Sequence, residues 1–502
     1  MPLQAVPLPP PFSGQFDRIP TFSVQNPFCI RARNWNNNNA KMGVRPGNRK
    51  HCTIATGLNM GLGALGSELF AFVATASPAG FAAWDITTTT PALDHSVAGG
   101  GLDVVETLLF RDRLFVFGDG PLLPSASGPR VYDGSTWGAA AYTWPVSFTP
   151  YGGCVYKNRA YIMGSDASYV YTEVDAISGT TYRVDLSGVL SAKSTLSSIR
   201  AVSLSENVQQ ETLIAFIFAS GEILVYGGSY PNNDSWGLSA RFQVDPLIAW
   251  DMTYKSPVID AKGDTFILTR NEILSLRNLL RQGYQKERDE GIGSAIPNRW
   301  KELVSGATGG FSYMIRGCYD SAKDRLVISW PKEVNPDTKV ATVRPMFLIY
   351  DFVNKAWYES YTAEGTLYNL GIIDFNGSVF TGHAVDASTA GYLQLETKTD
   401  FRDDKFSSGT VAIAYDLISA PHPLSRFGVV KAAALEVITK SDLYSVTNFS
   451  LIGDLGARVT ANQKTNGNGT NLTKAMVNIG LEANTIQYRI AGETVTATVG
   501  LE

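Results

Sequence analysis

The chain has 502 residues, of which 44% are hydrophobic and 11% aromatic, so it can bury more than one sizeable core. Its formal net charge of −4 argues against a protein that grips nucleic acid, because gripping phosphates needs clustered Lys and Arg. The longest basic stretch is the short one from Arg45 to Lys50. The low charged content of 18% suggests that much of the surface lies against other subunits, with a monomer as the alternative.

Residues 1–50 are predicted to form an extended N-terminal arm that lies across the body or an adjacent subunit. Prolines disfavour helix in the first twelve residues and favour extended backbone. The same segment lacks the basic and apolar regions of a secretory signal, and no apolar run in the chain approaches the ~20 residues of a membrane helix. We therefore expect synthesis in the cytoplasm and no membrane-spanning segment.

Residues 51–399 are predicted to form an irregular β-propeller, because one unit recurs along them. The segments TLLFRDRLFVFG (107–118) and GCVYKNRAYIMG (153–164) align without a gap, and each describes two strands around a tight polar turn. Looser copies occur at 67–85, 214–228, 257–276, 317–330 and 371–383. Small antiparallel units that recur every ~40 to 60 residues are typical of propeller blades, here about six or seven.

Two further segments fit the outer strands of blades. VYDGSTW (131–137) and IYDFVNKAW (349–357) share Tyr, Asp, a turn and Trp. We expect the Asp to cap the turn and the Trp to pack between neighbouring blades. Five tryptophans could instead stack on sugars, although we expect most of them to be packing residues: Trp84, Trp137, Trp144, Trp236 and Trp357.

Helix is expected to be scarce. The best candidate is Ile296 to Ser305, with Pro297 at a helix start and Trp300, Leu303 and Val304 on one face. The charged segment RQGYQKERDEG (281–291) is predicted to be an exposed loop between blades.

Residues 400–502 are predicted to form a separate C-terminal antiparallel β-sandwich-like domain, since longer alternating runs such as VAIAYDLI and TIQYRIAGETVTATVG replace the blade pattern. The charged, glycine-ending stretch DFRDDKFSSG (400–409) is the expected linker. The predicted fold class is therefore all-β.

The sequence predicts no catalytic, cofactor-binding or metal-binding residues. Asp400, Asp403 and Asp404 lack the alternating-oxygen spacing of calcium loops, so a solvated linker is the simpler explanation. Asp85, Asp94 and His95 could suggest acid–base chemistry, but no GxSxG nucleophile accompanies them.

The histidines and cysteines give no stronger signal. His51, His95, His383 and His422 have no zinc-ligand spacing, and structural roles are expected for the last two. The cysteines form no CxxC pair and have mostly apolar neighbours, so we expect four reduced, semi-buried thiols: Cys29, Cys52, Cys154 and Cys318.

The order of these parts resembles the propeller-bearing tail proteins of short-tailed bacteriophages, the tail nozzle or packaged-DNA-stabilisation type. The resembling segments are the Arg45-Pro46-Gly47 turn before the first blade, IYDFVNKAWYESY near the last blade, and the strand-rich segment entered through KFSSGTVAIAYDLISAPHPLSRFGVVKAAALEV (405–437). Together they span most of the chain.

The resemblance implies a structural virion protein of the tail and no enzyme. Six copies would form a tube below the portal and its adaptor protein, which retains the genome, conducts it during DNA ejection without sequence-specific binding, and can carry tail fibres. A mildly acidic conduit suits this role, because tight phosphate binding would stall passage. The alternative is a receptor- or carbohydrate-binding propeller, such as a tail fibre module or kelch-like scaffold. A propeller glycosidase is a third hypothesis, without visible paired carboxylates.

Overall fold

The computed structural model describes residues 29–494 apart from internal segments, of which the longest are 99–104, 119–128, 204–211, 249–256, 307–314, 335–340, 424–429 and 466–471. Beyond residue 400 it describes mainly the backbone. The predicted N-terminal arm falls largely on residues 1–28, which lie outside the described residues, so it stays a prediction.

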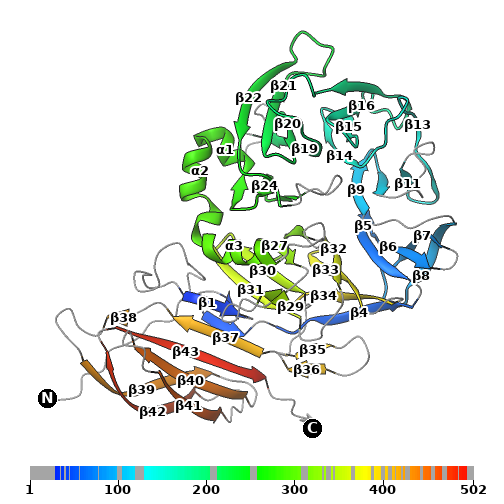
Figure 1. The fold of residues 1–502 in the computed structure, drawn as a ribbon. Helices are drawn as coiled ribbons and strands as arrows, with labels where there is room; N and C mark the ends of the chain where they lie inside the picture. The colour runs from blue at the N-terminus through cyan, green and yellow to red at the C-terminus, as the bar shows by residue number, and fades with distance from the viewer. Residues whose placement is uncertain are drawn as a thin grey trace.

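Seven antiparallel sheets surround a common centre, as Figure 1 shows, and each is one blade of a β-propeller. Blade 1 contains β5 (Leu58–Leu65), β6 (Glu68–Ala76), β7 (Ala79–Asp85) and β8 (Ala92–Ala98). Blade 2 contains β9 (Val105–Phe110), β10 (Arg113–Gly118), β11 (Arg130–Tyr132) and β12 (Trp137–Ala139). Blade 3 contains β14 (Gly152–Tyr156), β15 (Arg159–Met163), β16 (Ser168–Tyr171) and β18 (Tyr182–Asp185). The short strands β13 (Ala141–Thr143) and β17 (Ser178–Thr180) pair in parallel beside it.

The remaining blades vary the pattern. Blade 4 contains β19 (Leu196–Ser203), β20 (Thr212–Phe218), β21 (Glu222–Gly227) and β22 (Gly237–Gln243). Blade 5 has three strands: β23 (Val258–Ala261), β24 (Asp264–Leu268) and β25 (Ile273–Ser275). Blade 6 contains β26 (Arg316–Asp320), β27 (Arg325–Trp330), β30 (Met346–Asp351) and β31 (Ala356–Tyr361). In the chain, the small hairpin of β28 (Glu333–Val334) and β29 (Ala341–Thr342) comes between β27 and β30.

Blade 7 closes the ring with strands from two distant parts of the chain. Its strands β32 (Tyr368–Phe375), β33 (Ser378–Ala384) and β34 (Ala390–Gln394) are joined by β4 (Arg49–Ile54), which pairs antiparallel with β34. Backbone hydrogen bonds thus fasten the start of the propeller to its end. The prediction of an all-β propeller of about six or seven blades is confirmed, and the number is seven.

The repeated hairpins of the sequence fall one in each blade. In five blades they join the first strand to the second; segments 67–85 and 214–228 instead join the second to the third. In the two segments that align without a gap, the turn residues Arg111-Asp112 and Lys157-Asn158 all have positive φ. This is the geometry of a two-residue type I′ turn, whose twist matches that of the flanking strands. The aligned letters RDR and KNR therefore mark the same turn.

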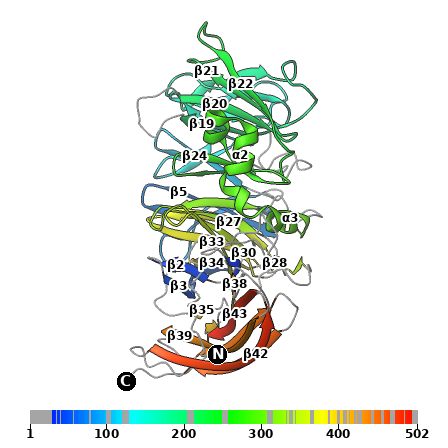
Figure 2. The same cartoon turned by 90° about the vertical axis from the view of Figure 1, so that its left-hand side faces the viewer.

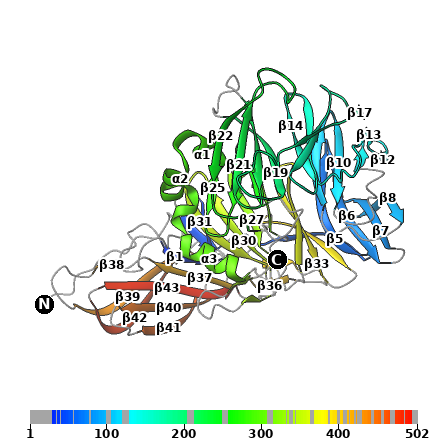
Figure 3. The same ribbon diagram turned by 45° about the horizontal axis from the view of Figure 1, so that its top comes forward.

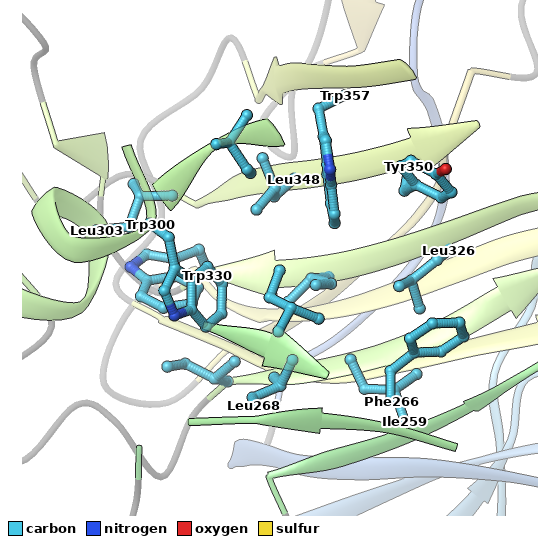
Figure 4. Close-up of a cluster of buried hydrophobic side chains, with 14 of the residues drawn as sticks. Ile259, Phe266, Leu268, Trp300, Leu303, Leu326, Trp330, Leu348, Tyr350 and Trp357 are labelled. Atoms are coloured by element: carbon cyan, nitrogen blue, oxygen red, sulfur yellow. The ribbon is translucent and has the colours of Figure 1, made fainter. Parts of the chain in front are cut away.

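Large aromatic side chains fill the space between neighbouring blades. Figure 4 shows one such core between blades 5 and 6, where Trp300 and Trp330 meet edge to face with ring centroids 5.3 Å apart. Trp357 is buried in the same cluster and donates from Nε1 to the Ile292 carbonyl at 2.8 Å. Truncating any of these indoles would leave a large cavity.

Helices cover the outer side of blade 5 in place of a fourth strand: α1 (Leu276–Gln282), α2 (Tyr284–Glu290), the 3₁₀ helix η2 (Ile292–Ala295) and α3 (Pro297–Gly306). The helix expected at 296–305 is confirmed as α3, but the prediction of a loop at 281–291 is wrong. Ser275 caps α1 by accepting a hydrogen bond from the Asn278 N–H, and Gly283, at φ 81°, separates α1 from α2. Buried Glu287 accepts the Ser275 N–H at 2.8 Å, which ties the charged segment to β25.

Strands from both ends of the chain extend the sheet of blade 6. The strand β1 (Cys29–Arg33) pairs in parallel with β31 and antiparallel with β37 (Ala414–Ser419), and β43 (Thr485–Thr494), β40 (Ser445–Gly453) and β41 (Arg458–Thr465) continue the same sheet. Figures 1 and 2 show these strands beside the propeller. The remaining strands are β2 (Trp35–Asn38), β3 (Lys41–Val44), β35 (Arg402–Asp404), β36 (Thr410–Ala412), β38 (His422–Pro423), β39 (Val430–Lys440) and β42 (Leu472–Ala483). That the C-terminal strands form a sandwich stays a prediction.

Candidate functional site: the central channel

The first strands of the blades surround the propeller axis, as the tilted view in Figure 3 helps to follow, and glycine lets them approach closely. A Cβ added to Gly371 on β32 would lie 3.1 Å from Leu62 Cγ on β5. One added to Gly317 on β26 would lie 2.3 Å from Ile259 Cδ1 on β23. The absence of these side chains brings neighbouring blades together at the centre.

A cavity of about 180 Å³ lies at this centre. It is lined by residues of six first strands: Gly61, Leu62, Glu106, Thr107, Arg200, Val258, Arg316, Gly317, Gly371 and Ile372. Glycine and charged side chains therefore share the channel wall. Small ligands generally bind in concave sites where a few polar groups converge, so this central cavity is the candidate functional site.

Arg200 of β19 joins three blades across the channel. Its Nη2 lies 3.3 Å from Glu106 Oε1 on β9, and its Nε lies 3.1 Å from Asp260 Oδ2 on β23. Burial acts to lower the pKa of Arg200, but the two carboxylates outweigh it and raise the pKa above its usual value. A Cβ on Gly152 would lie 2.7 Å from Glu106 Cδ, so the glycine of β14 makes room for this ion pair.

Arg316 of β26 has no such partner. Its Nη1 donates to the Ile315 carbonyl at 3.3 Å, and no carboxylate of the described chain lies within 4 Å of its guanidinium. Burial lowers the pKa of Arg316, and the Glu106 carboxylate offsets this only in part. The channel thus contains one arginine that is neutralised and one that is not.

Sequence analysis missed these charges, although a signal existed. Glu106, Gly152 and Arg316 each stand immediately before one of the repeated hairpin segments. Each is also four residues before the end of its strand, at Phe110, Tyr156 and Asp320. Gly61 and Gly371 hold the equivalent position in β5 and β32. A charge where other blades have glycine marks a residue that faces the channel.

The two Tyr/Asp…Trp segments behave as predicted. Asp133 accepts the N–H groups of Ser135 and Thr136 at 3.0 and 2.7 Å, and these hydrogen bonds lower its pKa to about 2. Trp137 of blade 2 packs edge to face on Phe70 of blade 1, with centroids 5.4 Å apart. In the second segment, Asp351 accepts the N–H groups of Val353 and Asn354, both at 2.9 Å.

The acid–base candidates do not converge on a reactive site. Asp94 accepts a hydrogen bond from Trp137 Nε1 at 2.5 Å, and His95 stacks on the same indole. Asp85 accepts the Thr87 N–H at 2.8 Å within its own turn. All three residues therefore make contacts that hold blade 1 and its border with blade 2. The side chains of Asp400, Asp403, Asp404 and His422 lie outside the described residues.

Burial dominates the ionisation of His383 and of the cysteines elsewhere in the described chain. His383 is fully buried, burial lowers its pKa to about 3, and Thr381 Oγ1 lies 2.8 Å from its Nε2. Cys52, Cys154 and Cys318 are free thiols, which confirms that part of the prediction. Burial raises the pKa of both Cys52 and Cys154 to about 12, so neither is a reactive thiolate at neutral pH.

The part of the chain that the structure describes contains no group of three or more metal-ligating side chains positioned to hold an ion. In the same part, no helix has the length and apolar character to cross a membrane.

Comparisons with known proteins identify no family for this chain. No family model matches the sequence, and no curated protein matches it. Similar solved structures include Sqt1 of Saccharomyces cerevisiae (9% identity, TM-score 0.40, 70% of this chain and 99% of that one). BamB of Moraxella catarrhalis is 7% identical, with a TM-score of 0.37 over 70% of this chain and 99% of that one. The WD40 β-propeller domain of Doa1 is 8% identical, with a TM-score of 0.39 over 70% of this chain and 96% of that one.

These likenesses are too distant to say what the chain does. The class is defined by the strand pairing itself, which makes the chain an all-β protein built around a seven-bladed β-propeller. Within this class, the features particular to it are the helical edge of blade 5, the extended sheet of blade 6 and the charged channel.

Proposed function

We propose that this protein is a structural subunit of a short-tailed phage tail, six copies of which form a nozzle below the portal and its adaptor. It would retain the packaged genome and conduct it during ejection, act by shape and not by catalysis, and work in the virion. The proposal extends the resemblance found in the sequence segments around Arg45-Pro46-Gly47, 349–361 and 405–437.

The observation that carries the proposal is the continuous sheet that runs from blade 6 through β1 into β37 and β43. Strands from the beginning and end of the chain are hydrogen-bonded to the outer edge of the propeller. The step from β1 to the disc is the pairing of Arg33 with Glu359 in β31, and through it a load on the C-terminal strands would reach the disc. A subunit that holds pressurised DNA needs this coupling.

The net charge of −4 supports the same role. Every phosphate that a conduit neutralises adds affinity by counterion release, so a basic lumen would slow the passage of DNA. We therefore expect weak DNA binding that shows no sequence preference.

Mass measurement tests the assembly. Six chains of 54.3 kDa weigh about 326 kDa. We expect native mass spectrometry to find this hexamer, either for the purified protein alone or after it is mixed with its portal–adaptor complex. A monomer under both conditions would contradict the proposal.

The alternative function, a receptor- or carbohydrate-binding propeller, is compatible with the fold. It would need exposed aromatic platforms, and four of the five tryptophans singled out already pack against protein rings. Trp236 stacks on Tyr226 and Trp144 stacks on Phe148, while Trp137 and Trp357 pack between blades. A monomer that binds defined sugars on a glycan array would favour this alternative.

A further inference from the structure

Three buried arginines of the propeller each have a carboxylate partner, whereas the half-buried Arg316 has none within 4 Å among the described residues. Arg159, Arg299 and Arg325 each lie within 3.1 Å of a carboxylate oxygen, from Glu173, Glu359 and Glu396 respectively. Arg316 makes a single hydrogen bond, to a backbone carbonyl, among the residues that the structure describes. A guanidinium stays charged even when its pKa falls, so Arg316 holds a positive charge in a confined place without a counterion.

The space next to Arg316 is open. The central cavity of about 180 Å³ is large enough for several water molecules or for one small ion. Gly61, Gly317 and Gly371 line it and contribute no side chain that could fill it. Thr107 adds a hydroxyl to the wall, and a hydroxyl can donate to an anion.

The other charges of the channel are already paired with one another. Glu106 and Asp260 both lie against Arg200, at 3.3 and 3.1 Å. Glu106 also acts on Arg316 at longer range, but it is an ion-pair partner of Arg200, so no carboxylate of the described residues lies within 4 Å of Arg316. A bound anion would supply the counterion that Arg316 does not have among the described residues.

We propose that the central channel binds a small oxyanion, a phosphate or a carboxylate, on the guanidinium of Arg316. The planar fork of N–H donors matches two oxygens of such an anion, and its hydrogen bonds to an ionised acceptor are stronger than those between neutral groups. Confinement among the first strands strengthens the attraction further. Glu106 opposes the anion, so affinity is modest and a small ligand is favoured. This inference is independent of the proposed function.

Thermal unfolding in phosphate tests the site. A ligand that binds only the folded state raises its stability with concentration, so we expect inorganic phosphate to raise the melting temperature of the wild-type protein at constant ionic strength. Arg316→Gln should abolish this shift. Arg183→Gln is the matched control, because it removes an exposed arginine paired with Asp166 on the outer edge of blade 3 and should keep the shift.

Parallel titrations with acetate and succinate distinguish the two sources of oxyanion. A shift with phosphate alone identifies a phosphate site, and a shift with the carboxylates identifies a carboxylate site. No shift with any of them in the wild-type protein, or an equal shift in Arg316→Gln, would overturn the proposal.

A second measurement does not depend on the variant folding. Electron cryomicroscopy of the wild-type protein with tungstate, an electron-dense oxyanion, should show strong density beside Arg316. Density confined to other arginines would overturn the assignment.

Discussion

The two edges of blade 6 each hold an arginine, and the two arginines have different partners: Arg299 is buried and Arg316 is half-buried. At the outer edge, Arg299 of α3 donates from Nε and Nη2 to the two carboxylate oxygens of Glu359 on β31, at 2.6 and 2.9 Å. Tyr361 donates to the same carboxylate and Glu302 accepts from Arg299 Nη1. At the inner edge, Arg316 of β26 has one backbone carbonyl and an open cavity.

The difference in partners indicates that Arg299 has a structural role, whereas Arg316 is free to bind a ligand in the cavity. The outer arginine fixes α3 onto the strand that continues into β1, and every strong donor is used by protein. The inner arginine has N–H donors that no acceptor among the described residues uses. Glu287 is a third case, a buried carboxylate held by neutral donors such as the Ser275 N–H and Gln282 Nε2. The consequences of these three arrangements can be measured.

The largest expected effect is at the outer edge. Arg299→Met should lower the free energy of unfolding by about 3–5 kcal/mol, because it leaves the Glu359 carboxylate buried without its cation. Urea-induced unfolding followed by tryptophan fluorescence measures the loss. The double variant Arg299→Met/Glu359→Leu should recover most of it, since no charge then remains buried. A loss below about 1 kcal/mol in the single variant, as for an exposed pair, would contradict the comparison.

A smaller effect is expected at Glu287, and it depends on pH. Burial raises the pKa of Glu287 from 4.5 to about 7. The folded state therefore retains a proton that the unfolded state loses, so this group's contribution to stability is full below pH 4.5 and is lost as the pH rises to 7. We expect the wild-type protein to lose about 2–3 kcal/mol relative to Glu287→Gln between pH 4.5 and 8. Parallel pH profiles for the two proteins would refute this account.

The smallest effect is expected for Glu106→Gln in the channel. The loss of one of the two ion pairs of Arg200 should cost about 1 kcal/mol, because Asp260 remains as a partner. The same change removes the negative charge that opposes an anion at Arg316. Phosphate should therefore bind several-fold more tightly to Glu106→Gln than to the wild-type protein in calorimetric titration. Unchanged or weaker binding would mean that the anion lies elsewhere.

Local patterns predicted the blades well. The type I′ turns at Arg111-Asp112 and Lys157-Asn158, the turn cap at Asp133 and the indole of Trp137 all depend on residues close together in the sequence. The helix beginning at Pro297 was also predicted from residues close together in the sequence. The segment 281–291 was predicted wrongly because its charges suggested solvent, whereas Glu287 is buried through a contact with Ser275 twelve residues away.

The channel could not be predicted in the same way. Glu106 and Arg200 are 94 residues apart and belong to different blades, so only closure of the ring brings them together. The pairing of β4 with β34 and of β1 with β31 also joins distant segments. A comparison of equivalent positions between hairpins would have singled out Glu106 and Arg316. It would not have shown which carboxylates reach which arginine.

Electron microscopy of the purified protein mixed with its portal–adaptor complex tests the central claim most directly. The proposed function predicts a six-fold tube in which each subunit carries one seven-bladed disc joined to its C-terminal strands. Single discs with no symmetric assembly on the portal complex would contradict it.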